Sequence, residues 1–291
     1  MARTMAIRQT PSTRVLPLRR VLGDIALYAL LLAVSLFMLL PFIWMVSTSL
    51  KPVDEIFAIP PIILSPHASF NSYQFLIEHY NILRIVLNTF IVAAGATVLQ
   101  LFFCSLGGYG FAKYKFPGKA VLFAFLLGTM IIPFTIIMVP LYVIMRDLKW
   151  IDTYWAILIP SAANAFGIFF MRQYISSISD ELLDAARIDG ASEFGIYWRI
   201  IVPIIAPGLI SFGLIIFMGT WNSYLWPLII LKSPENFTLP LTISSMTGPV
   251  GRTVYDVQMA AAVISIIPLL IIFLIFQRRF VEGITAGAVR G

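Results

Sequence analysis

Six long runs of the chain contain no charged residue, and each is long enough to cross a bilayer as a helix. They cover residues 25–50, 85–112, 120–145, 153–171, 200–231 and 257–277. A helical span takes roughly 17–25 residues. The fifth run is longer than that, so we expect its first residues to lie outside the lipid and the span to cover 206–231. The run 153–171 is the weakest of the six, because proline, serine, asparagine and glycine interrupt it.

These runs predict an all-α polytopic membrane protein with six transmembrane helices over residues 25–277. Backbone amides find no water in hydrocarbon, so each span must satisfy its hydrogen bonds internally as a helix. The alternation of a membrane β-barrel is absent. A basic segment, 1–24, precedes the spans, and a tail, 278–291, follows them. Five prolines within the spans are expected to kink them: Pro133, Pro140, Pro160, Pro227 and Pro268.

The composition supports a membrane protein and excludes several other classes. Hydrophobic residues make up 59% of the 291 residues and charged residues 12%, whereas soluble domains carry about 25% charge. One cysteine and two histidines leave no thiolate cluster and no histidine-rich metal site. We therefore predict no metal site and no catalytic residue in this chain.

The basic residues predict the orientation. With six spans, both termini share one side with the loops 113–119 and 172–199, and that side carries 14 of the 20 lysines and arginines. The positive-inside bias places it in the cytoplasm. The net charge of +6 is thus explained by topology, and no nucleic-acid partner is expected. Both termini are therefore predicted to lie in the cytoplasm.

The spans also lack the groups that other membrane functions use. None contains an acidic or basic residue, whereas ion-coupled carriers usually keep an intramembrane carboxylate. No catalytic motif of a membrane enzyme is present. The Gly-Lys pair at 118–119 lacks the glycine that begins a phosphate-binding loop. If ATP drives this protein, another subunit must bind it.

The cytoplasmic loop 172–203 carries the most specific pattern. Ser179 is a plausible N-cap of a helix whose first turn contains Asp180 and Glu181. Gly190 is a natural C-terminal stop, and Ser192 can cap a second short helix. The sequence predicts a helix–glycine–helix elbow with a net acidic charge, which suits a protein partner. An amphipathic loop that packs only on its own bundle is the alternative.

The loop contains Asp184-Ala185-Ala186, then Gly190 after three residues, and Ile200-Ile201-Val202-Pro203 after nine more. This pattern resembles the Glu-Ala-Ala loop of ATP-binding-cassette importer permeases. Relative to the pattern of that family, aspartate replaces glutamate at position 184 and valine replaces leucine at position 202. Further segments are similar to the maltose-type carbohydrate permeases, and to the shorter permease of their heterodimer. They lie at 49–55, 88–89, 108–113, 132–133, 139–142, 152–153, 221–228 and 280–291.

The resemblance implies a type I importer fold and a chain that is no enzyme itself. It also implies a location in the cytoplasmic (inner) membrane of a bacterium or archaeon, with both termini inside. The expected partners are a second permease, two ATPase subunits that hold ATP and Mg²⁺, an extracytoplasmic solute-binding protein and a carbohydrate substrate. ATP binding would move the elbow at 180–198 and rock the spans between inward-open and outward-open states. The residues expected to couple to the ATPase are Glu181, Asp184, Ala185, Ala186, Asp189, Gly190 and Pro203.

A sugar path needs hydrogen-bonding groups beside aromatic faces. The fifth span offers Trp221, Asn222 and Tyr224, and Asn88 and Asn164 add polar groups in other spans. Two alternatives remain open. The asparagines can form hydrogen bonds between membrane helices, and the second permease can supply most of the sugar contacts. A stand-alone secondary carrier is the alternative function, and a membrane enzyme is a third.

Overall fold

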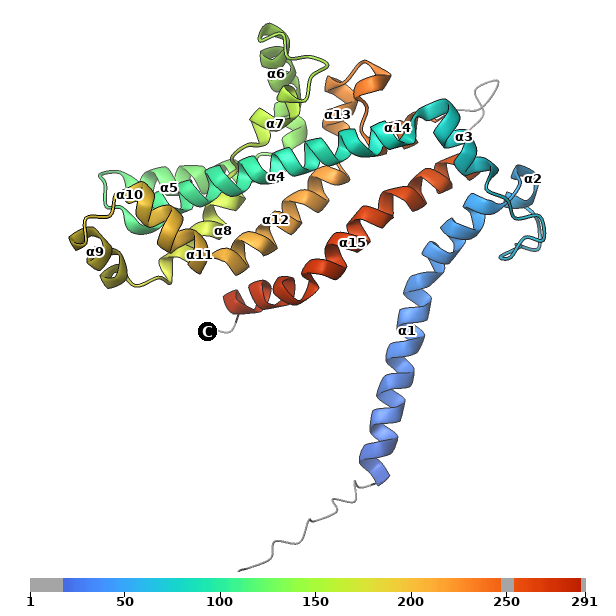
Figure 1. Cartoon of the computed structure of the whole chain (residues 1–291), viewed down its shortest axis with the longest axis horizontal. Coiled ribbons are helices and arrows are strands. Elements are labelled where there is room, and N and C mark those ends of the chain that lie inside the picture. The colour runs from blue at the N-terminus through green and yellow to red at the C-terminus, as the bar shows by residue number, and fades with distance from the viewer. Residues whose placement is uncertain (1–17, 247–253, 289–291) are drawn as a thin grey trace, which may run out of the picture.

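The computed structural model describes residues 18–246 and 254–288, with side chains over 22–246 and 254–277. Every regular element in these ranges is helical. The basic segment 1–17 and the end of the tail, 289–291, lie outside the described residues, so the expectations for them are not addressed. The helices form an elongated molecule built around one long central helix, α4 (Ile82–Lys113) (Figure 1).

Three helices are long and apolar enough to cross a membrane unaided: α1 (Leu18–Leu50), α4 and α15 (Tyr255–Ala288). At 1.5 Å per residue, the 32 residues of α4 extend about 48 Å, well beyond a hydrocarbon core of about 30 Å. Helix α4 can therefore carry contacts from one side of a bilayer to the other.

Three further expected spans are bent. The helices α5 (Lys119–Gly128) and η1 (Thr129–Ile131) meet α6 (Phe134–Asp147) at 100°, and α7 (Trp155–Ser161) meets α8 (Ala165–Ser176) at 45°. The helices predicted over 120–145 and 153–171, in which prolines were expected to produce kinks, are thus each divided into two helices. The first break is at Pro133, whose extended backbone ends the preceding turn. The second is at Asn164, which is also extended.

The fifth expected span differs most from its prediction. Its central helix, α12 (Ala206–Trp221), is followed by a separate helix, α13 (Leu225–Ile230), so 206–231 is not one helix. Pro227 has no N–H to donate to the carbonyl of Ser223, and Asn222 bonds back to the Met218 carbonyl. Before α12 the chain turns by 80°, so the expected start near 206 agrees with the structure.

The turn before α12 joins it to three short helical segments: α10 (Glu193–Ile196), the π-helical turn η2 (Tyr197–Ile201) and α11 (Val202–Ile204). By length and composition, the described residues contain three possible membrane spans, or six when each bent pair counts as one. The predicted number therefore depends on how the bent pairs are counted.

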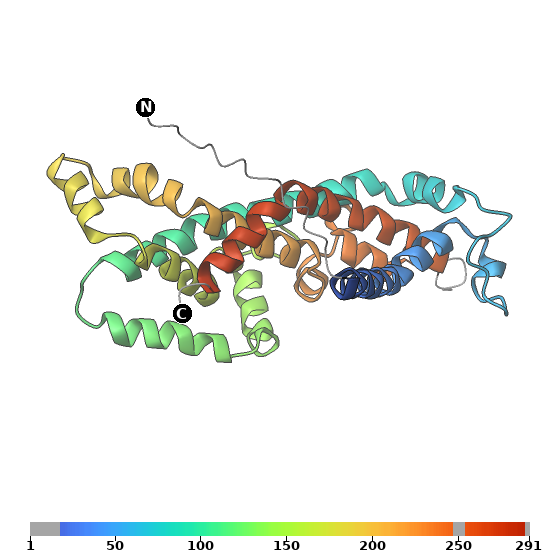
Figure 2. The ribbon, with the colours of Figure 1, turned by 90° about the horizontal axis from the view of Figure 1, so that it is seen from below.

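The loops gather at two opposite ends of the molecule (Figures 1 and 2). One end holds α2 (Val53–Ile56), α3 (Asn71–Tyr80), η3 (Pro234–Asn236) and α14 (Leu239–Ser245). The other holds α9 (Asp180–Ile188) and α10. We call them the outer end and the elbow end.

At the outer end, one carboxylate joins two loops. Asp152 Oδ1 accepts the backbone N–H groups of Lys232 and Ser233 at 2.8 and 3.0 Å, and the Ser233 hydroxyl donates to Oδ2. These donors hold the pKa of Asp152 at about 2 in spite of its partial desolvation. The loop after α6 and the loop after α13 are thereby held together.

Most of helix α1 stands away from the other helices, and only its last turns contact α15 and α3 (Figure 1). All of its described side chains from 22 to 44 are exposed, and burial begins only near Thr48 and Ser49. The core is instead built on α4, which packs on α8 and α12, with α15 against α12. Close packing of α4 on α8 depends on Gly108, which lies directly against the backbone of Arg172.

Candidate functional site

The elbow end has the helix–glycine–helix structure that the sequence predicts. Ser179 Oγ accepts the N–H of Glu181 at 3.2 Å, and Ser192 Oγ accepts the N–H of Gly195 at 3.1 Å, so both predicted N-caps are confirmed. Helix α9 then ends at Gly190, which has a φ of +81°. We refer to residues 179–198 as the elbow.

The end of α9 is a Schellman motif. The Gly190 N–H donates to the Arg187 carbonyl, and the Ala191 N–H donates to the Ala186 carbonyl, each at 3.0 Å. These two bonds satisfy carbonyls that the helix end would otherwise leave unpaired. The elbow is therefore defined by backbone hydrogen bonds and has little freedom to change its angle.

Most of the expected coupling residues lie together on the open face of the elbow. Leu183 is buried, while Glu181, Asp184, Ala185, Asp189 and Gly190 are exposed. Two expected residues differ from these: Ala186 is half-buried, and Pro203 lies in α11, beyond the elbow. The elbow also exposes large apolar side chains at Leu182, Ile188, Phe194 and Trp198, and Ile188 is the most exposed of them at 86%.

A network of hydrogen bonds connects the elbow to the end of α4. Glu193 Oε2 accepts the hydroxyls of Tyr109 and Tyr114 at 2.9 and 2.6 Å. Arg187 Nε donates to Glu193 Oε1 at 2.8 Å, and Arg187 Nη1 donates to Asp184 Oδ1 at 2.7 Å. Sequence spacing gives no indication of this network, because 84 residues separate Tyr109 from Glu193.

The network keeps Glu193 charged. Hydrogen bonds from Arg187 and Tyr114 outweigh desolvation and hold the pKa of Glu193 at about 2. A carboxyl whose pKa is lowered in the folded state stabilises that state above its usual pKa and loses this contribution as the pH falls toward 2. Glu193 is thus a fixed negative charge at every pH near neutrality.

A second contact attaches the start of α9 to α4. Lys113 Nζ lies 2.7 Å from Asp180 Oδ1 and also donates to the Ile178 carbonyl. The Lys113 side chain is only 5% exposed, but the Asp180 side chain is 75% exposed, so water still reaches the acidic side of this ion pair. In addition, the hydroxyls of Ser105 and Tyr197 are 2.7 Å apart, and this contact connects α4 to η2.

Two of the expected path residues have structural contacts. Asn88 is buried, and its Nδ2 donates to the carbonyls of Glu235 and Phe237 at 2.8 and 3.2 Å. Trp221 is fully buried, and its Nε1 donates to the Ser265 carbonyl at 3.2 Å. Both side chains connect helices and loops, which is the alternative role considered for the asparagine.

Asn164 has both a structural contact and access to a cavity. Its Oδ1 accepts the Gly167 N–H at 2.7 Å and so caps α8, while its Nδ2 donates to Gln100 Oε1. It also lines a cavity of about 800 Å³ between α4, α6, α7, α8 and the end of α12. The other polar and aromatic residues of this lining are Gln100, Thr129, Phe134, Ser161, Phe166, Thr220, Ser223 and Trp226.

Asn222 and Tyr224 lie at a second cavity, of about 500 Å³, which Gln258 and Ser265 of α15 also line. Asn222 Nδ2 is engaged with the Met218 carbonyl at 2.8 Å. Both residues are exposed. The break between α12 and α13 therefore presents an amide and a phenol to a cavity with further polar groups on α15.

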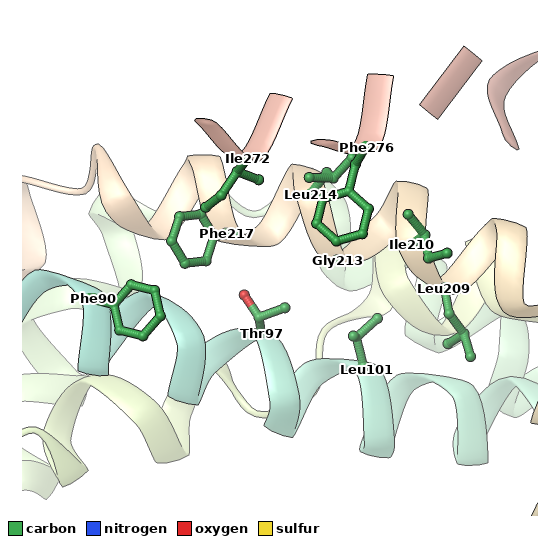
Figure 3. Close-up of a pocket in the computed structure, with 10 residues that line it drawn as sticks. All are labelled: Phe90, Thr97, Leu101, Leu209, Ile210, Gly213, Leu214, Phe217, Ile272 and Phe276. Carbon is green, nitrogen blue, oxygen red and sulfur yellow. The ribbon is translucent and has the colours of Figure 1, made fainter. Parts of the chain in front are cut away.

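A third cavity, of about 440 Å³, lies between α4, α12 and α15 and is apolar throughout (Figure 3). Thr97 is its single polar lining residue, and the Thr97 hydroxyl donates to the Ala93 carbonyl at 2.7 Å. Phe90, Leu101, Phe217 and Phe276 face the same space. A polar solute finds no free hydrogen-bonding partner there, so this cavity is not a candidate for its path.

Among the described residues, no cluster of three or more histidines, cysteines or carboxylates is arranged to hold a metal ion. The described cavities contain no nucleophile paired with a base. The candidate site offers two cavities with polar lining groups and a hydrogen-bonded junction between the elbow and the end of α4.

Known proteins share both the sequence and the fold. An arabinooligosaccharide transport permease from Bacillus subtilis is 37% identical, over 92% of this chain and 96% of that protein. A lactose transport permease from Rhizobium radiobacter is 33% identical, over 94% of this chain and 98% of that protein. A chain of a bacterial ABC transporter that imports the polysaccharide alginate superposes with a TM-score of 0.77 at 29% identity, covering 90% of this chain and 97% of that one.

The match extends to a defined family of transport proteins. Residues 104–286 match the family described as "Binding-protein-dependent transport system inner membrane component". This segment includes α8, the elbow, α12 and most of α15. The chain belongs to this family and is a transport permease with the fold of a type I ABC importer permease.

Proposed function

We propose that this chain is the permease subunit of an ATP-driven importer for a sugar or a related carbohydrate. The observation that carries the proposal is the elbow: a capped, charged and exposed structure at one end of a helix that crosses the whole molecule. The sugar-transporting relatives favour a carbohydrate as the cargo.

The elbow suits an ATPase partner. Its exposed face combines carboxylates (Glu181, Asp184, Asp189), small alanines and the apolar Ile188. A groove with basic or amide donors around an apolar pocket complements that face. In this proposal two ATPase subunits hold ATP and Mg²⁺, a second permease completes the membrane part, and an extracytoplasmic binding protein delivers the sugar at the outer end. The elbow end and both termini face the cytoplasm, in keeping with the basic excess there.

A reconstitution experiment tests this function. The chain is purified with its partner permease and ATPases, placed in vesicles, and supplied with the binding protein and labelled sugar. We expect uptake only when ATP is supplied on the side of the membrane that carries the ATPase subunits. Uptake should stop when the ATPases are omitted. Uphill uptake by the chain alone would instead establish the stand-alone carrier.

We further propose that the sugar passes the break between α12 and α13. The supporting observation is that Asn222 and Tyr224 line the same cavity as Gln258. An amide and a phenol supply hydrogen bonds, and the tyrosine ring supplies an apolar face for sugar C–H groups. Asn164, on the larger cavity, belongs to the same proposed path. Asn88 and Trp221 are instead proposed to hold helices and loops together through their hydrogen bonds.

Asn222→Ala and Tyr224→Ala are expected to lower the rate of sugar uptake by about three- to tenfold, because each removes one hydrogen bond to the solute. ATPase binding and the stability of the complex should be unchanged. Gln277→Ala is the matched control, since Gln277 is exposed on α15 and lines neither cavity. Uptake kinetics that stay the same in both variants would remove this break from the path.

A further inference from the structure

Glu193 occupies an unusual position in the elbow. It begins α10, and its carboxylate accepts hydrogen bonds from Tyr109, Tyr114 and Arg187. A fourth and longer bond comes from Arg187 Nη2, at 3.4 Å from Oε2. The donors come from the end of α4, from the residue after it, and from α9. One side chain thus holds three segments together.

We propose that Glu193 is the positioning residue that passes movement of the elbow to α4. The proposal rests on the proposed function, because it assumes that an ATPase moves the elbow. Without a tie to α4, the connecting residues 189–192 could bend and absorb the displacement. With it, α9, α10 and the end of α4 move as one body.

The chemistry of the junction requires a carboxylate. An ionised carboxylate accepts hydrogen bonds at about four positions and donates none. Glu193 uses this capacity on four donor groups, two of them from a guanidinium. A glutamine has the same shape, but its amide nitrogen would face a donor in place of an acceptor. Charge-assisted bonds are also roughly twice as strong as neutral ones.

Helix α4 is suited to carry the movement further. It packs closely on α8 along its second half. Near its first turns, Asn88 donates to the carbonyls of Glu235 and Phe237, and Thr89 accepts the N–H of Leu239 at 2.8 Å. A shift of α4 at the elbow end therefore reaches η3 and α14 at the outer end, where a binding protein would deliver the sugar.

The test uses the complete importer in vesicles and measures the sugar molecules taken up for each ATP hydrolysed. We expect Glu193→Gln to lower this ratio by about fivefold or more, the size of a typical coupling between sites. The amount of assembled complex and its rate of ATP hydrolysis should stay near those of the unaltered protein. Asp24→Asn makes the corresponding chemical change at an exposed carboxylate of α1, outside the elbow and the outer end, and should leave the ratio unchanged.

A second variant approaches the same junction from α4. The double substitution Tyr109→Phe and Tyr114→Phe removes two donors but keeps the ion pair between Glu193 and Arg187. It should lower the ratio in the same direction, and combining it with Glu193→Gln should add little, because both break one junction.

The outcomes separate the inference from the function beneath it. An unchanged ratio in Glu193→Gln would overturn the inference, and so would loss of assembly in Glu193→Gln with a normal ratio in the tyrosine variant, since Glu193 would then be only structural. If the unaltered complex shows no ATP-dependent uptake, the proposed function itself fails, whatever the variants do.

Discussion

Replacing Gly190 by proline is expected to reduce coupled sugar uptake about tenfold or more, while the chain still inserts and assembles. Gly190 has a φ of +81°, and proline fixes φ near about −65°. Proline also lacks the N–H that donates to the Arg187 carbonyl in the Schellman motif. Helix α9 would lose its defined end, and the elbow would lose the fixed angle that makes it useful for transmitting movement.

Gly190→Asn is the matched control. A Cβ at this position meets nothing within 4 Å, so a larger side chain has room, and only the backbone conformation is at issue. Asparagine adopts the left-handed region far more readily than other residues with a Cβ and keeps the N–H. We expect it to retain most of the uptake. Normal uptake per ATP in Gly190→Pro would show that the angle of the elbow does not matter.

The elbow could be predicted from sequence because its signals are local. Ser179, Gly190 and Ser192 act on hydrogen bonds within a few residues of themselves, and each has a strong positional preference. The apolar spans were predictable for a similar reason, since their length alone fixes what they can cross. Structural features that depend only on a short stretch of chain can therefore be predicted from the sequence.

The bends and the network were not predictable in the same way. Proline at 133 indicates a kink, but the sequence does not give the 100° angle, since α6 packs on α13, a helix far away in the chain. The contact between Tyr109 and Glu193 joins segments far apart in the chain, and no periodicity reports it. Asn88 shows the same limit: its type suggested a sugar contact, and only the fold shows that its amide bonds two outer carbonyls.

The closest approach of α4 to α8 gives the other large expected effect. A Cβ on Gly108 would lie 2.7 Å from Met171 Cβ and 2.8 Å from the Arg172 backbone nitrogen. Neither atom can rotate away, because both are fixed by the backbone of α8. Helix pairs in membranes rely on small residues for such close contact, since van der Waals packing replaces the hydrophobic effect there.

Gly108→Ala is therefore expected to destabilise the folded chain by about 1–3 kcal/mol, the usual cost of overpacking, or by more if α4 and α8 must separate along their length. The midpoint of thermal unfolding in mild detergent, followed by tryptophan fluorescence, should fall by several degrees. The effect should also reach the elbow, because α4 and α8 lead directly into it, so the uptake per ATP should fall together with stability.

Gly110→Ala separates packing from helix propensity. It lies on the same helix two residues later, and its Cβ would meet nothing within 4 Å. Alanine favours a helix over glycine by up to about 1 kcal/mol, so this variant should be neutral or slightly stabilising. A lower unfolding midpoint in Gly108→Ala together with an equal or higher midpoint in Gly110→Ala would establish that close contact between α4 and α8 stabilises this half of the molecule. Equal midpoints for the two variants would show that α8 can yield, and then α4 would not be the rigid connection between the elbow and the outer end.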